Sequence, residues 1–415
     1  MKGKTAYIRA LLDQIIYGAS ASLNFIVLAN LIPLDTYAML AAIYSYIVLY
    51  QMVSNAMLMD AFTVNLPTLG INQSQKYFLY VVRLLLLLSL PVAAVVFVIY
   101  LAYAGLSLGH VVEVWIFLSA SVAFSLMMFA RRLCYSMKSE TDALLGSLTY
   151  VAVYAAALAI GYSLSMLGLD FILASLGIAS LASFLLVSFR LRVLRAFLAP
   201  AGWQLDTAEL DCFHRRYARM GFLTGSLKWV PDNLLFSLLG VSGTLDQIAT
   251  FRMATNLLMP FRYLVVSLVN VLLPKYAALA AEGRSAESWR HVVQLIAIFV
   301  AASAGMFALF WVFGDLILSL LYRSATGPVL LVVLVLSAVP AFSAAQAFAA
   351  TFLKSIRKIR AVALQSVLGA LVTALPGTLL IINFGAMGAA LTLVASMLSM
   401  SLFGIFLVVR SQRTD

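Results

Sequence analysis

The chain has 415 residues, of which 64% are hydrophobic and 10% charged, and its mean hydropathy is +1.03. Soluble domains are about 45–50% apolar and about 25% charged, so this composition excludes a water-soluble fold. A net charge of +11 is common in nucleic-acid-binding proteins. The basic residues here lie between apolar stretches rather than on one soluble face, which excludes that class.

The apolar stretches are long enough to cross a bilayer, which takes about 20 residues in a helix. Backbone groups in hydrocarbon must be hydrogen-bonded within their own segment, so each stretch is predicted to be a helix. The sequence predicts an all-α polytopic membrane protein with about twelve spans. They run over residues 8–31, 36–62, 78–101, 109–130, 143–165, 169–188, 218–240, 245–273, 291–313, 328–353, 361–382 and 385–409.

Lys2, Lys4 and Arg9 form a basic region at the start of the chain, and residues 19–21 (Ala-Ser-Ala) resemble a signal-peptide cleavage site. Asp13 interrupts the short apolar stretch that a signal peptide needs. We therefore predict that this segment is retained as the first helix.

The lysines and arginines predict the orientation of the spans, because they gather in cytoplasmic loops. Of the 27 lysines and arginines, nearly all lie at the span ends of one side, and Arg323 alone lies in the opposite loops. Both termini are therefore predicted to be cytoplasmic. Cys134 and Cys212 fall on the same, reducing side, so no disulfide is predicted.

The longest polar interval, residues 189–217, divides the chain into two six-helix halves. We predict an N-terminal lobe at 1–188, a cytoplasmic linker at 189–217 and a C-terminal lobe at 218–415. The first part of the linker is both basic and apolar, so it is either an interfacial segment on the anionic leaflet or a plain connection.

The two halves share a weak sequence repeat. Tyr7-x-Arg9 opens the first helix and Tyr217-x-Arg219 the seventh, and Leu34-Asp35 is matched by Leu245-Asp246. Because each half starts and ends on the cytoplasmic side, the repeat would be a parallel one about an axis along the membrane normal. Such repeats are typical of transporters, with the binding site between the halves.

Polar residues within the spans concentrate in the first, second, seventh and eighth helices, which open the two halves. A charge near a helix centre costs about 2.5–3.5 kcal/mol on insertion scales, so it usually faces a cavity or a partner. The basic residues predicted to line a cationic cleft are Lys228, Arg252 and Arg262. The other polar residues predicted to line the cleft, or to couple transport to an ion, are Asp13, Asn24, Asp232, Asn233 and Asn256.

A structural interpretation of the same residues stays open. Lys228 and Asp232 are four residues apart and could neutralise each other, and the asparagines could join helices by hydrogen bonds. Packing alone does not explain why the charges are confined to four matching helices. The set as a whole therefore favours a cavity.

Motifs for chemistry are absent from the sequence. There is no phosphate-binding Gly-x-x-x-x-Gly-Lys-Ser/Thr loop and no Gly-x-Ser-x-Gly nucleophile motif, and the three histidines are scattered away from metal-ligand spacing. We predict no enzymatic activity and no cofactor. The pattern favours an ion-coupled secondary transporter, with Asp13 or Asp232 as a candidate H⁺ or Na⁺ site.

Short motifs in both halves resemble a known family. They are Asp13-Gln14, Asn24-Phe25, Leu28-Ala29 and Tyr37-Ala38 in the first half, and Arg216-Tyr217, Leu257-Leu258-Met259-Pro260 and Leu273-Pro274 in the second. This chain resembles oligosaccharide flippases of the O-antigen (Wzx-like) type. They belong to the multidrug/oligosaccharidyl-lipid/polysaccharide exporter superfamily. The resemblance implies two six-helix lobes around a central cleft.

The resemblance also implies a function. The cargo would be an oligosaccharide on undecaprenyl pyrophosphate, flipped from the inner to the outer leaflet of the bacterial cytoplasmic membrane for assembly of surface polysaccharide such as O-antigen, capsule or exopolysaccharide. Lys228, Arg252 and Arg262 are the positions that would hold the pyrophosphate, by charge-assisted hydrogen bonds. A monomer is expected, with membrane lipids, a polysaccharide polymerase and chain-length proteins as partners and no nucleic acid.

Two other functions compete with this one. A multidrug or cation antiporter of the same superfamily would carry cationic cargo and would need an acidic cleft, which the deep basic residues disfavour. A membrane-embedded polysaccharide polymerase would need a sizeable outer loop with catalytic residues, whereas the predicted outer loops are all short.

Overall fold

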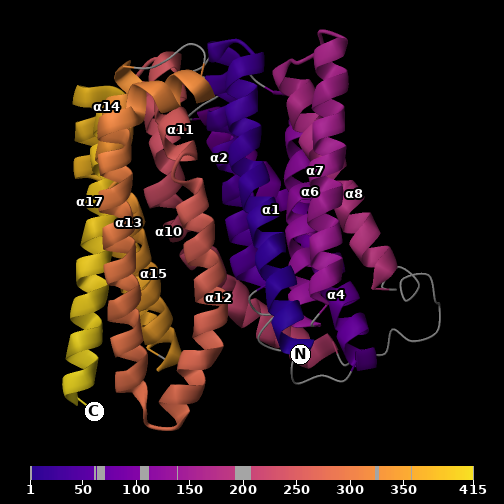
Figure 1. Ribbon diagram of the computed structural model, residues 1–415. Helices are drawn as coiled ribbons and strands as arrows, with labels where there is room; N and C mark the ends of the chain where they lie inside the picture. The colour runs from indigo at the N-terminus through magenta and orange to yellow at the C-terminus, as the bar shows by residue number, and fades with distance from the viewer. Residues whose placement is uncertain are drawn as a thin grey trace. The chain divides into compact units, whose positions relative to one another are not determined.

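The computed structural model describes residues 2–59, 62, 71–102, 112–137, 139–191, 207–322, 327–356 and 358–414, and these are almost entirely helical (Figure 1). Arg323, which the sequence places in an outer loop, and residues 192–206 of the predicted linker lie outside the described residues. The helices are α1 (Lys2–Leu31), α2 (Leu34–Ser54), η1 (Asn55–Met59), α4 (Ile71–Tyr100), α6 (Val114–Ser136), α7 (Glu140–Ser163), α8 (Leu169–Arg190), α10 (Thr207–Ser242), α11 (Leu245–Asn256), α12 (Met259–Ala281), α13 (Ser285–Leu321), α14 (Gly327–Leu336), α15 (Val339–Ser355), α16 (Ile359–Ala374) and α17 (Pro376–Thr414).

Helix length and hydropathy confirm a multi-pass membrane protein. Among the described residues, 8 helices are long and apolar enough to cross a membrane, or 9 if a bent pair within α4 counts as one span. The remaining predicted spans are broken helices or carry charges. α10 is one of these, and it contains Lys228 and Asp232 near the middle of the predicted span.

Prolines explain two of the breaks. Pro260 has no N–H to donate to the carbonyl four residues before it, and α11 ends at that residue, Asn256. Pro340 stands in the same relation to Leu336, where α14 ends. The predicted spans 245–273 and 328–353 are therefore each two helices, α11 with α12 and α14 with α15.

The last two predicted spans form a helical hairpin made of α16 and α17, and its turn lies inside α17. Gly385 has φ 55° and ψ −129°, which interrupts the helix and reverses the chain. This conformation strongly favours glycine. Across the hairpin, the hydroxyls of Thr373 and Ser396 are 2.7 Å apart, and Gln365 Nε2 donates to the carbonyl of Met400 at 2.7 Å. The turn falls at the predicted boundary between the spans 361–382 and 385–409.

The helix boundaries support the sequence repeat. α1 ends at Leu31 and α2 begins at Leu34, while α10 ends at Ser242 and α11 begins at Leu245. The second junction follows the first by the same number of residues as Leu245-Asp246 follows Leu34-Asp35. α10 starts at Thr207, so part of the predicted linker is helical.

The chain forms two compact units, the first from Met1–Tyr17 and Ala42–Trp229 and the second from Gly18–Ala41 and Val230–Asp415. In the first unit, α6, α7 and α8 run side by side (Figure 1). In the second unit, α15 contacts α12, α13 and α17. The division into lobes at 1–188 and 218–415 stays a prediction.

Candidate functional site

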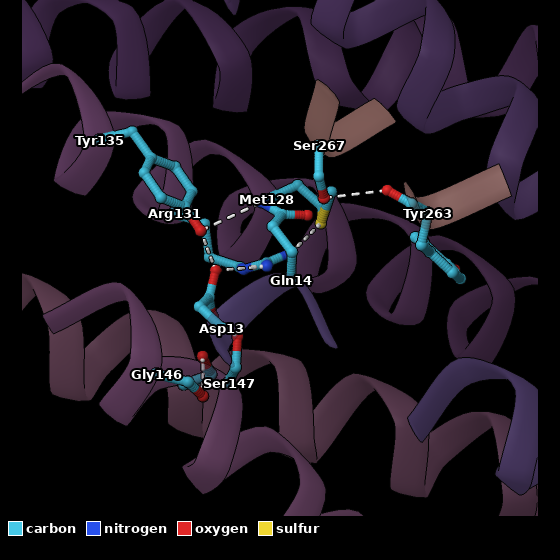
Figure 2. Close-up of polar contacts among 10 residues, drawn as sticks. Asp13, Gln14, Met128, Arg131, Tyr135, Gly146, Ser147, Tyr263 and Ser267 are labelled. Atoms are coloured by element: carbon cyan, nitrogen blue, oxygen red, sulfur yellow. Dashed lines mark hydrogen bonds and ion pairs between the residues drawn. The ribbon is translucent and has the colours of Figure 1, made fainter. Parts of the chain in front are cut away.

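Asp13 is the centre of a buried polar cluster in the first unit (Figure 2). Its side chain is fully buried, and Arg131 Nη2 on α6 donates to Oδ2 at 2.7 Å. The hydroxyl of Tyr135, one helical turn after Arg131, donates to the same oxygen. The hydroxyl of Ser147 on α7 donates to Oδ1. Three helices therefore meet at one carboxylate.

Arg131 itself is only 3% exposed. Its guanidinium lies over the ring of Tyr17, 3.9 Å from the ring centroid, which adds a cation–π contact to the ion pair. Gln14 Nε2 donates to the Tyr135 hydroxyl at 3.0 Å and so extends the cluster along α1. A buried charge needs both a counter-charge and hydrogen bonds, and this cluster supplies both.

Arg131 was not predicted as part of the site. Its sequence position next to Arg132 suggested a cytoplasmic loop, but α6 continues to Ser136 and carries Arg131 inward to Asp13. The signal in the sequence was the single acid within the first span, which required a cation from another helix.

Arg252, which was predicted to line the cationic cleft, lies in the second unit and is buried, with 4% of its surface exposed. Its guanidinium is 3.6 Å from the centroid of the Phe25 ring and 5.6 Å from that of Phe236. Asn256, one turn further along α11, is 1% exposed and donates to the hydroxyl of Tyr37 at 2.9 Å. The two residues share a face, as predicted, and that face packs on aromatic side chains.

The predicted Arg262 and Asp232 form an ion pair, with Nη2 and Oδ2 2.5 Å apart. Their side chains are 33% and 15% exposed, so this pair is far more accessible than Asp13–Arg131. The other predicted polar residues of the second unit, Asn24 and Asn233, are half-buried.

Lys228 is the predicted cation that the structure leaves exposed, in the first unit. The helix that carries it packs closely on α2 through Gly225 and Trp229. A Cβ on Gly225 would lie 2.9 Å from the carbonyl oxygen of Met52, and Trp229 Nε1 donates to the carbonyl of Ser45 at 2.6 Å. This contact fixes how α10 is rotated about its own axis, and therefore on which side of the helix Lys228 lies.

An apolar groove lies beside the same part of α10. It has a volume of about 280 Å³ and is lined by α2, α4 and α10, from which it takes Leu49, Val53, Leu88, Pro91, Val92, Val95, Val96, Ile99, Phe222 and Ser226. At 3.6 residues per turn, Phe222 and Ser226 lie on one flank of the stripe formed by Gly225 and Trp229. Lys228 lies on the other flank.

These features describe a polytopic helical protein with charged and polar residues inside its spans, as in membrane transporters. Comparison with solved structures identifies the fold. An inward-facing multidrug resistance MATE family transporter of the MOP superfamily superposes with a TM-score of 0.70 at 12% identity, and the match covers 99% of both chains.

Other transporters of that superfamily give similar values. The lipid II flippase MurJ has a TM-score of 0.71 at 14% identity, and the match covers 97% of this chain and 87% of that one. A MOP superfamily transporter from Pyrococcus furiosus, described as having a binding pocket of reverse polarity, has a TM-score of 0.67 at 12% identity over 99% and 95% of the two chains. No family model and no curated protein matches the sequence. The chain therefore has the fold of MOP superfamily transporters.

Proposed function

We propose that this protein is a secondary transporter that flips an undecaprenyl-pyrophosphate-linked oligosaccharide from the inner to the outer leaflet for assembly of surface polysaccharide. The observation that carries the proposal is the pairing, on one stretch of α10, of an exposed lysine with an apolar groove. A lipid-linked cargo has an anionic headgroup and a hydrocarbon tail, so it needs both features.

Lys228 supports binding of the headgroup. A lysine exposed to hydrocarbon at the middle of a span is costly, so its ammonium group is expected to face water or an anion. A pyrophosphate would bind it by charge-assisted hydrogen bonds, which are stronger than neutral ones. Arg252 is packed on aromatic rings and Arg262 is paired with Asp232. Their role as headgroup ligands therefore stays a prediction.

The groove supports binding of the tail. Its lining is apolar apart from Ser226, and it is formed by helices that are predicted to span the membrane. The groove includes Pro91, next to the point where α4 bends by 40°. A part of the prenyl chain would fill it while the headgroup binds on the Lys228 flank of α10.

Proteoliposomes with a fluorescent polyprenyl-pyrophosphate-linked oligosaccharide would test the proposal, with dithionite to quench the label in the outer leaflet. We expect Lys228→Ala to slow flipping by about tenfold or more, since a hydrogen bond to a charged group contributes about 1.5–3 kcal/mol. Lys228→Arg should retain most of the rate. Lys275→Ala, which removes an exposed lysine of α12, is the matched control. Equal rates for Lys228→Ala and wild type, at equal reconstitution, would contradict the proposal.

The groove is tested in the same assay by Val95→Trp, which should fill it and slow flipping. Val98→Trp is the control, because Val98 is 62% exposed on the same helix and does not line the groove. A Val95→Trp protein that flips the cargo as fast as Val98→Trp would exclude the groove from the transport path.

A multidrug exporter of the same superfamily is the second candidate, and the extensive likeness to a MATE family transporter favours it. Such a protein should drive uptake of a lipophilic cation such as ethidium into vesicles. We expect no such uptake, because the exposed Lys228 would repel that cargo. Ethidium transport without flipping of the glycolipid would reverse the assignment.

The cellular setting belongs to the same proposal. The bacterial inner membrane and the partnership with a polysaccharide polymerase and chain-length proteins follow from the proposed cargo. Cytoplasmic termini are predicted from the distribution of lysines and arginines. Coupling to H⁺ or Na⁺ stays a prediction, with Asp13 and Asp232 as the candidate sites.

A further inference from the structure

Both oxygens of the Asp13 carboxylate accept hydrogen bonds within the first unit. Oδ2 accepts from Arg131 at 2.7 Å and from Tyr135, and Oδ1 accepts from Ser147. The side chain is fully buried. All the partners come from α6 and α7, and all of them are donors.

This arrangement is unfavourable for a metal cation. Hard cations such as Na⁺ need several acceptor oxygens with free lone pairs, and a guanidinium at ion-pair distance repels them. The carboxylate of Asp142, on the same helix as Ser147, already has its own partners, Arg190 Nε at 2.5 Å and the Ser139 hydroxyl at 2.5 Å. Among the described residues, no group of three His, Cys, Asp or Glu side chains could hold a metal ion.

The helices around the cluster are held closely together. Ser183 on α8 donates to the carbonyl of Gly146 at 2.8 Å, and a Cβ on Gly146 would lie 2.7 Å from a methyl group of Val187. Gly146 directly precedes Ser147, so the contact with α8 fixes the donor to Asp13 (Figure 2). The site is a packed core in which the positive charge is supplied by the chain itself.

We propose that Arg131 is a tethered counter-cation that occupies the place of a coupling ion at Asp13. Asp13 then joins α1 to α6 and α7 and does not bind Na⁺ from solution. This inference concerns the energy source of transport and is independent of the cargo. It replaces the prediction that Asp13 is a Na⁺ site.

The inference is tested by the cation dependence of thermal unfolding, followed by tryptophan fluorescence of the purified full chain. NaCl, LiCl and KCl are each compared with choline chloride at constant ionic strength. The wild type and Arg131→Lys should unfold at the same temperature in all four salts. Arg131→Ala should unfold at a lower temperature in choline and should recover by several degrees, with saturation, in Na⁺ or Li⁺. Arg131→Ala combined with Asp13→Asn should lose that recovery.

Saturable stabilisation of the wild type by Na⁺ that Asp13→Asn abolishes would overturn the inference, as would a folded Arg131→Ala variant that responds to no cation. If Arg131→Ala does not fold, binding of ²²Na⁺ to the wild type and to Asp13→Asn decides the question. Equal binding supports the inference, and binding that depends on Asp13 overturns it. None of these measurements uses flipping, so their outcome is separate from that of the proposed function.

Discussion

At the scale of single residues, the ion pairs Asp13–Arg131 and Asp232–Arg262 differ in how much stability their loss would cost. Asp13 and Arg131 are 0% and 4% exposed at the side chain, whereas Asp232 and Arg262 are 15% and 33% exposed. Removal of one member of a buried pair strands the other charge and typically costs about 3–5 kcal/mol. A pair in contact with water contributes far less.

Asp13→Asn is therefore expected to lower the free energy of unfolding by about 3–5 kcal/mol. Asp232→Asn should lower it by about 1 kcal/mol or less, because water can solvate Arg262. Thermal unfolding of the two purified variants beside wild type measures the difference, with Asp35→Asn, an exposed acid at the start of α2, as the control. Equal shifts for the two pairs would show that the cluster around Asp13 is not the buried core described here.

The sequence predicted which residues are unusual better than it predicted their partners. It placed Lys228, Arg252 and Arg262 inside helices, because a charge interrupts an apolar stretch visibly. It did not predict that Arg131 pairs with Asp13, or that Asn256 bonds to Tyr37. These partners lie 118 and 219 residues apart along the chain. Which helices pack together is decided by side-chain shape over the whole fold, and a single sequence does not display it.

At the scale of helices, close approach between α2 and α10 depends on a residue without a side chain. The backbone of α2 lies so near Gly225 that an added Cβ would be 2.9 Å from the Met52 carbonyl oxygen and 3.1 Å from Val53 Cα. Backbone atoms cannot rotate away as a flexible side chain can. A substitution must therefore separate the two helices, with loss of the contact between Trp229 and Ser45.

Gly225→Ala is expected to destabilise the protein by about 1–3 kcal/mol, the usual cost of overpacking. It should also increase the quenching of Trp229 fluorescence by a polar quencher. Gly305→Ala on α13 is the matched control, because nothing lies within 4 Å of its added Cβ. If the two glycine variants were equally stable, α10 and α2 would not be in the close contact described.

Helices were more predictable than their interruptions. Apolar length alone located nearly every span, since lipid imposes it directly. The breaks at Asn256 and Leu336 lie four residues before prolines, so their signal was present in the sequence. The bend of α4 next to Pro91 had the same kind of signal. The early start of α10 at Thr207 had none, because this segment is polar and resembles a linker.

At the scale of the whole molecule, the fold is shared with transporters at only 12–14% sequence identity. Such divergence is expected where the bilayer supplies most of the constraint. Any apolar side chain satisfies a lipid-facing position, while the order and number of spans must be kept. Fold class was therefore predictable from composition and periodicity. The cargo was not, since it depends on a few polar residues that these relatives need not share.

Topology is the prediction that belongs to this scale. With twelve spans and basic loops inside, the loop between α10 and α11 should face outward, and the loop between α12 and α13 should face the cytoplasm. Thr244 and Arg284 are exposed in these two loops. In a background with Cys134→Ala and Cys212→Ser, Thr244→Cys should react with an impermeant maleimide on intact cells. Arg284→Cys should react only after the membrane is opened. The reverse pattern would place both termini outside, and labelling of both cysteines from the same side would mean that α11 and α12 together do not cross the membrane.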